Sequence, residues 1–193
     1  MKKVIVIFNF SILTMLSLTA CNNGGNTKAV ETDKPKTVIK AVNVPVQTST
    51  ASISEIVKYY LALKNALTAD KTNEAAAAGK ALEATIKSFN KTALTDAQKK
   101  VFADVEDDAR EHAEHIGSNG GNIEHQREHF DTLSKDIYSL VKVFGAGQTL
   151  YQDFCPMYND SKGATWLSET KDINNPYFGK KMSTCGSMKE ELK

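Results

Sequence analysis

Four sulfur-bearing side chains near the C-terminus have the chemistry of a metal site. Cys155 and Met157 are separated by one residue in FCPMY, and Met182 and Cys185 follow later in MSTCG. Thiolate and thioether sulfurs are soft donors, which suit Cu(I) and similarly soft ions such as Ag(I). Zinc prefers cysteines combined with histidines and without thioethers. The pattern therefore predicts a soft-metal site for Cu(I) or Ag(I).

A disulfide between Cys155 and Cys185 accounts for the same two cysteines. It would close the loop of residues 156–184 and stabilise the fold by about 3–4 kcal/mol by restricting the unfolded chain. Met157 and Met182 would then fill gaps between aromatic side chains. A third hypothesis joins the two, with reduced thiols binding metal and oxidation closing the site. Residue chemistry alone leaves all three open.

The histidines are the second group of potential ligands. All four lie in one short segment: His112, His115, His125 and His129. The first two are three residues apart and the last two are four apart, so each pair lies on one side of a helix. The turn GSNGGN between the pairs would place them at one end of a helical hairpin, where imidazoles can bind metal. Glutamates lie among them, however, and we favour a solvated, ion-paired helix end.

The N-terminus has the pattern of a lipoprotein signal peptide. Residues 1–20 combine MKK with an apolar run, and Leu18-Thr19-Ala20-Cys21 has the form of a lipobox, in which cleavage precedes the cysteine and lipid such as palmitate is attached. The alternative, a short membrane anchor, needs roughly 20 apolar residues. We expect a protein of the bacterial cell envelope, anchored through Cys21, facing the periplasm and held on a flexible tether over residues 21–50.

Residues 51–147 have the pattern of four helices. Ser52 to Glu55 and Thr95 to Gln98 fit capping boxes, which begin two of them. An alanine-rich segment after Asp70 favours another helix, and apolar residues recur at helical spacing throughout. The glycines of GSNGGN end the third helix before the fourth begins. The short connections predict an all-α fold, an antiparallel up-down four-helix bundle.

Residues 148–193 differ in composition from the bundle. Aromatic residues, Pro, Asn, Gly, Cys and Met replace the helix-favouring alanines. We expect an irregular cap laid over the bundle within one domain of residues 51–193, because so short a segment buries too little surface to fold alone. LYQDFC has the composition of a short strand, and the only tryptophan, Trp166, is expected to anchor the cap by packing.

Charge and motifs exclude several classes of function. The formal net charge is +1 and no basic stripe is present, so we expect no nucleic-acid partner and no membrane contact beyond the lipid. The sequence has no HExxH, no phosphate-binding glycine loop, no GxSxG and no CxxC. We therefore expect a protein that is not an enzyme.

Seven segments carry a resemblance to a known family: in order, YYLALKNALTAD, AEHI, HQREHFDTLS, YQDFCPMYND, ATWLS, NPYFGKKM and CG. Over about residues 55–190 the chain resembles the family catalogued as domain of unknown function 3347. That family occurs as small exported lipoproteins and as a domain appended to periplasmic adaptors of copper/silver-type efflux systems, a context that implies metal handling. The matching positions are His115, Cys155, Met157, Met182 and Cys185, and the resemblance favours metal binding by the cysteines.

The sequence thus predicts an envelope lipoprotein that binds Cu(I) or Ag(I), either to buffer the ion or to pass it to heavy-metal efflux. Cys155 and Cys185 would be the principal ligands, Met157 and Met182 would complete or tune the site, and His115 would lie nearby. The expected partner is an efflux adaptor or a metallochaperone. The chain lacks the coiled-coil and barrel regions of an adaptor. The alternative is a non-metal interaction module, stapled by a Cys155–Cys185 disulfide.

Overall fold

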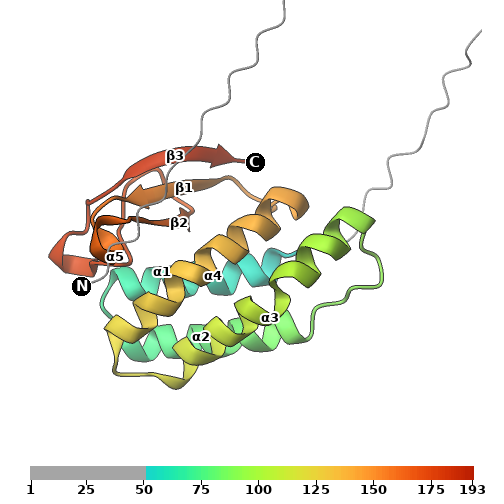
Figure 1. Cartoon of the computed structure of the whole chain (residues 1–193), viewed down its shortest axis with the longest axis horizontal. Helices are drawn as coiled ribbons and strands as arrows, with labels where there is room; N and C mark the ends of the chain where they lie inside the picture. Colours follow the sequence, from blue (N-terminus) through green and yellow to red (C-terminus); the bar gives the residue numbers. More distant parts are fainter. Residues whose placement is uncertain (1–50) are drawn as a thin grey trace, which may run out of the picture. The chain divides into compact units, whose positions relative to one another are not determined.

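The computed structural model of the protein describes residues 51–193 (Figure 1). The predicted signal peptide, the lipidation site Cys21 and the tether of residues 21–50 lie outside the described residues. Within residues 51–193, none of the helices combines the length and the apolar character needed to cross a membrane.

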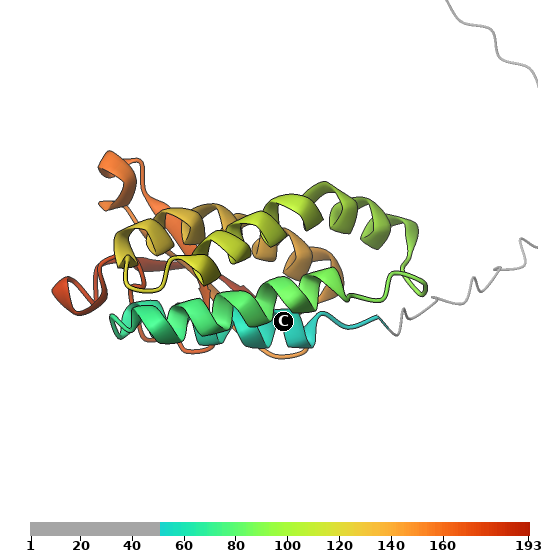
Figure 2. The same cartoon turned by 90° about the horizontal axis from the view of Figure 1, so that it is seen from below.

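Four long helices occupy the first two thirds of the described chain. They are α1 (Ser54–Thr68), α2 (Thr72–Lys87), α3 (Asp96–Ser118) and α4 (Ile123–Phe144). Each helix packs against the next one in sequence, as the two views show (Figures 1 and 2). The prediction of four helices joined by short connections is confirmed. Their apolar stripes meet in a core with large buried side chains from every helix: Tyr60, Leu63, Leu82, Ile86, Phe102, Ile116, Phe130 and Leu133.

One of the two predicted capping boxes is formed. Thr95 accepts a hydrogen bond from the Gln98 backbone N–H at 3.3 Å, and the Gln98 side chain accepts one from the Thr95 N–H at 3.0 Å. The box predicted at Ser52 to Glu55 is wrong, because α1 begins after Ile53, which makes no side-chain cap. Ile53 is buried in the core, and Ser52 accepts a hydrogen bond from the Ser54 N–H instead.

The C-terminal cap is a small antiparallel sheet, which corrects the expectation of an all-α fold with an irregular cap. Its strands are β1 (Leu150–Cys155), β2 (Ala164–Ser168) and β3 (Ser187–Leu192), in the order β2-β1-β3. The predicted strand LYQDFC is β1. The sequence of β3, SMKEEL, has no alternating apolar pattern. This strand lies at the edge of the sheet and is largely exposed, so it has few side chains to bury. Its position comes from pairing with β1.

The sheet and the helices share one hydrophobic core. Strand β2 packs against α4 and α1, so that the sheet covers these helices (Figure 1). Leu150 from β1, Trp166 and Leu167 from β2 and Tyr177 from the following loop are buried in the same cluster as the helical side chains. Trp166, which is 1% exposed, is the packing anchor that the sequence predicts.

Two short elements complete the cap. The turn α5 (Tyr158–Ser161) connects β1 to β2, and the 3₁₀ helix η1 (Gly179–Lys181) lies between β2 and β3. Asn159 and Asp160 have φ angles of 54° and 53°, so α5 is a left-handed turn rather than an ordinary helix. Asn and Asp tolerate this conformation better than other residues with a side chain.

Helix α2 approaches the C-terminal end of α3 closely at Gly79. A Cβ atom added at Gly79 of α2 would lie 2.9 Å from the Ala113 carbonyl oxygen and 3.0 Å from the Gly117 nitrogen, both on α3. These are backbone atoms that cannot rotate away. Gly79 therefore lets α2 pack directly against the last turns of α3, which also carry His115.

We expect Gly79→Ala to lower the free energy of unfolding by about 1–3 kcal/mol, the usual cost of overpacking. This cost outweighs the gain of up to about 1 kcal/mol in helix propensity. Urea unfolding monitored by circular dichroism measures it. Gly120→Ala is the control, because its added Cβ would meet the movable Asn73 side chain at 3.2 Å, so its stability should be nearly unchanged. Equal stability of both variants would contradict a sterically required glycine at position 79.

Candidate functional site

The structure brings Cys155 and Cys185 together. Cys155 ends β1, and Cys185 lies two residues before β3, which pairs with β1 in the register Phe154 opposite Ser187. The two Sγ atoms are 3.0 Å apart, and both cysteines are free thiols. A disulfide bond would be about 2.05 Å long. The hydrogen bond with Cys155, together with burial, raises the pKa of the Cys185 thiol.

A buried asparagine holds the loop that carries Cys185. The Asn175 amide donates to the Cys185 carbonyl oxygen at 2.6 Å, and its side-chain oxygen accepts from the N–H groups of Tyr177 and Phe178. The Cys185 N–H donates to the Met182 carbonyl oxygen at 3.1 Å. Asn175 is fully buried, so these bonds are shielded from water. They fix the backbone of Cys185 beside β1.

Arg127 of α4 ties this loop to the helices. Its guanidinium donates to the Pro176 carbonyl oxygen at 2.7 Å and to the Leu67 carbonyl oxygen at 3.0 Å, and it pairs with Asp70 at 2.6 Å. Burial pushes the pKa of Asp70 up, but hydrogen bonds from Arg127 and from the Lys180 N–H outweigh it, and the pKa lies below its usual value. Arg127 could not be recognised from the sequence, because its partners are distant in sequence.

The two predicted methionine ligands lie between the two cysteines in the sequence. Met157 is 54% exposed and lies at the start of the α5 turn, two residues after Cys155. Met182 is half-buried at the end of η1. Among the described residues, neither thioether is hydrogen-bonded to a thiol. Of the four predicted sulfur ligands, the structure therefore brings the two thiols together.

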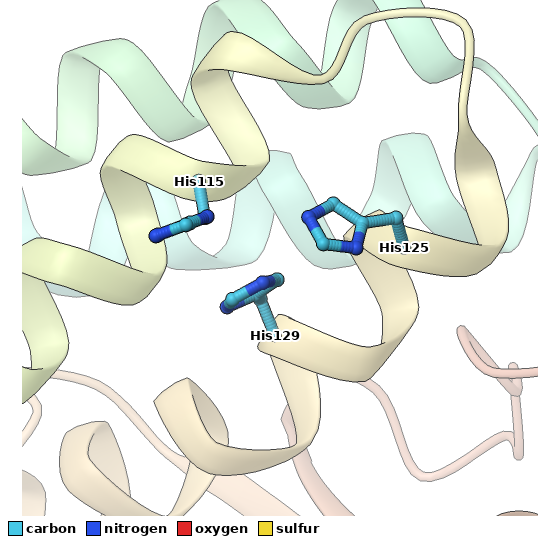
Figure 3. A group of neighbouring side chains, drawn as sticks. All are labelled: His115, His125 and His129. Carbon is cyan, nitrogen blue, oxygen red and sulfur yellow. The ribbon is translucent and has the colours of Figure 1, made fainter.

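The histidines form a separate group between the ends of α3 and α4. His115 comes from α3, and His125 and His129 come from α4, with their rings turned toward one another (Figure 3). One ligating nitrogen of each lies within 4.8 Å of the other two. Over residues 51–193 this is the one group of three or more His, Cys, Asp or Glu side chains so arranged. The structure thus places the predicted ligand His115 with imidazoles and not with the cysteines.

The turn between the helices positions this histidine group. The Asn119 amide donates to the His115 carbonyl oxygen at 2.8 Å and closes α3, while Asn122 accepts from the His125 N–H at 3.2 Å and caps α4. Gln126, fully buried, donates to the Ile116 carbonyl oxygen at 3.1 Å. The backbone at His115 and at His125 is therefore fixed by the same turn.

The imidazoles interact more closely with one another than with acids. His112 Nδ1 lies 2.9 Å from His129 Nδ1, and the rings of His115 and His129 stack with centroids 4.4 Å apart. The contacts to Glu111 and Glu128 are longer, 3.9 Å from His115 and 3.6 Å from His125. The ion-paired helix end that the sequence favours is thus not the main feature here, because the histidine–glutamate contacts are longer than the closest contact between histidines.

Burial and mutual repulsion keep two of these rings uncharged at neutral pH. Burial, together with the neighbouring charges of His115, His112 and His125, lowers the pKa of His129 to about 4. Burial also lowers the pKa of His112, against the opposing effects of Glu111 and Asp108. Neutral imidazole is the form that binds metal ions.

A third polar group, which no pattern in the sequence indicates, lies between α1 and the sheet. Lys64, 1% exposed, pairs with Glu169 at 2.8 Å between Nζ and Oε2. Asp153 of β1 is fully buried, and neither of its oxygens has a hydrogen-bond partner. Burial raises the pKa of Asp153 to about 7, while the charge of Lys64 acts against the rise.

Comparison with known proteins identifies the helical part of the chain. Residues 56–149 match the model of a family described as protein of unknown function (DUF3347), which covers α1 to α4 and ends before β1. Searches of curated proteins and of solved structures found no match. The match agrees with the resemblance seen in the sequence, although the cap with both cysteines lies beyond the matched residues. Residues 56–149 are therefore similar to the DUF3347 family of proteins of unknown function.

Proposed function

We propose that this protein binds a soft monovalent metal ion, Cu(I) or Ag(I), through Cys155 and Cys185. The observation that carries the proposal is the pair of free thiols, with Sγ atoms 3.0 Å apart. Two thiolates held side by side are suited to a soft ion. Cys155 is fully buried, which would shield a bound ion from water, and the half-buried Cys185 leaves the site open on one side.

Binding requires a small movement of the thiols. Metal–thiolate bonds are about 2.3 Å long for zinc, so two sulfurs that share an ion stand further apart than 3.0 Å. The half-buried side chain of Cys185 can rotate while its backbone stays held by Asn175, whereas Cys155 is fully buried in the central strand β1. Met157 and Met182, which lie two and three residues from the nearer cysteine in the sequence, would complete or tune the coordination.

The role of such a site would be to buffer the ion or to pass it to heavy-metal efflux. Thiolates and thioethers exchange Cu(I) between proteins without a redox step by the carrier. Attachment through Cys21 would hold the domain in the envelope, where an efflux adaptor or a metallochaperone is the expected partner. We also propose that the four helices run up and down in sequence order, each antiparallel to the next. The packing of each helix on the next one supports this order.

An anaerobic Cu(I) titration tests the proposal. The reduced chain from residue 21 onward, carrying Cys21→Ser, should take one Cu(I) from a chromogenic chelator. Cys155→Ser/Cys185→Ser should weaken binding by more than about 100-fold, and Met157→Leu/Met182→Leu by about 10-fold. Met188→Leu is the matched control, because Met188 is an exposed methionine of β3, and it should bind like the parent.

A parent chain that never competes with the chelator would overturn the proposal, as would a double cysteine variant that binds equally well. The proximity of the thiols also suits their oxidation to a disulfide. A thiol count on the non-reduced protein separates the two functions. No free thiol, together with no Cu(I) binding after reduction, would favour the alternative of a stapled, non-metal interaction module.

A further inference from the structure

We propose that His115, His125 and His129 form a second metal site, one that takes a divalent cation of borderline softness such as Zn²⁺ or Cu²⁺. This inference does not depend on the cysteine site, because it uses other residues, on α3 and α4, and another class of ion. Imidazole nitrogens suit zinc, copper(II) and nickel, and three of them make a known kind of zinc site.

The geometry is close to that of a bound ion. Each ring offers one nitrogen, and the three nitrogens lie within 4.8 Å of one another (Figure 3). Zn–N bonds of 2.0–2.1 Å in a tetrahedron place the nitrogens about 3.3 Å apart. The rings therefore need to close by about 1.5 Å at most, which rotation about the side-chain bonds achieves. The backbone of the two helices need not move, since the turn already fixes it.

His112 would act as a positioning residue for the site. Its Nδ1 lies 2.9 Å from Nδ1 of His129, so one of these nitrogens carries the shared proton. When His129 donates it, its Nε2 is left as the free nitrogen. A metal-binding histidine usually donates its other N–H to such a partner, which fixes the ring orientation. Glu128 lies beside His125, with 3.6 Å between Oε2 and Nδ1, a distance too long for a hydrogen bond.

The surroundings favour a cation and leave room for a fourth ligand. The side chains of His115 and His125 are 45% and 33% exposed, so an ion held by the three rings would face solvent on one side. Glu111 and Glu128 place negative charge beside them, which raises the local concentration of cations. A water molecule or a side chain from another protein can fill the open position.

A Zn²⁺ titration in the Cys21→Ser/Cys155→Ser/Cys185→Ser background tests this site in the absence of thiols. One Zn²⁺ should bind per chain, measured by competition with a chromogenic zinc chelator. His115→Gln/His125→Gln should weaken the affinity by more than about 100-fold, and His112→Gln by about 10-fold. Glu114→Gln is the matched control on the same helix end, where Glu114 has only a 3.9 Å contact with Arg110, and it should bind Zn²⁺ like the background.

The histidine variants should keep the helical circular dichroism of the background, because His115 and His125 are partly exposed. Cu²⁺ gives a second readout, a paramagnetic resonance spectrum with splitting from three nitrogens. Failure of stoichiometric Zn²⁺ binding in the background would overturn the inference, and so would unchanged binding by His115→Gln/His125→Gln. Neither result bears on Cu(I) binding by the cysteines, which the intact thiols test separately.

Discussion

Arg127→Met is expected to lower the free energy of unfolding by about 2–4 kcal/mol. The guanidinium donates to the carbonyl oxygens of Leu67 and Pro176 and pairs with Asp70, so its loss removes three contacts. The Pro176 carbonyl then loses its Arg127 donor, whereas Leu67 keeps the Asp70 N–H and the Asp70 carboxylate keeps the Lys180 N–H. Asp70 is 36% exposed and can be solvated in part, which keeps the loss below that of a fully buried pair. Urea unfolding measures the change.

Two further variants decide how Arg127 acts. Arg127→Lys keeps the charge but cannot reach all three acceptors, so it should recover part of the lost stability. Arg110→Met is the matched control, because Arg110 is 37% exposed with contacts of 3.9 Å, and it should cost less than about 0.5 kcal/mol. An equal loss at both arginines would show that Arg127 contributes only general surface charge.

The stabilisation by Arg127 should depend on pH. Because the pKa of Asp70 lies below its usual value in the fold, the pair contributes fully above the pKa of an unfolded aspartate. Its contribution is lost as the pH falls through the lower, folded value. The difference in stability between the parent and Arg127→Met should therefore shrink in acid. Arg127 binds the Pro176 carbonyl, next to Asn175, and Asn175 in turn holds the backbone of Cys185. If Cys185 is a Cu(I) ligand, Arg127→Met should therefore also weaken Cu(I) binding.

The helices were predictable because their signals are local. The capping box at Thr95 and the apolar stripes of the helices depend on residues a few positions apart, and both are confirmed. The cysteine pair was also predictable as a pair, from residue type alone. The sheet was not, since β3 has no apolar alternation and is held in place by pairing with β1, which is distant in sequence.

The remaining features depend on packing that no short segment encodes. The register between β1 and β3 shifts between Gln152 and Asp153, where β3 has the extra residue Lys189. By the alternation of a strand, Asp153 and Cys155 of β1 lie on the side opposite Leu150, yet all three are buried, so both sides of β1 are covered in part. The histidine pairs were visible in the sequence, but whether they meet depends on the rotation of α3 against α4. That rotation turns the imidazoles toward one another.

Lys64→Met should lower the free energy of unfolding by about 3 kcal/mol, because it removes a buried cation that pairs with the half-buried Glu169 and acts on the buried Asp153. Lys64 pairs with Glu169 at 2.8 Å, and the buried Asp153 has no hydrogen-bond partner to replace it. Burial raises the pKa of Glu169, but hydrogen bonds from Lys64 and Asn65 outweigh it and hold the pKa below its usual value. The loss should therefore be full at pH 7 and diminish as the pH falls through the folded pKa of Glu169.

A double-mutant cycle separates the ion pair from packing. Lys64→Met/Glu169→Met replaces both charges with apolar side chains of similar length, and buried pairs exchanged in this way lose little stability. We expect the double variant to recover most of the stability lost in Lys64→Met, with thermal and urea unfolding as the measurements. Lys58→Met is the control, since Lys58 lies on the exposed side of α1 with 60% of its side chain accessible. If the double variant were as unstable as Lys64→Met, the loss of stability would come from the packing of the lysine side chain. The ion pair with Glu169 would then contribute little to the stability.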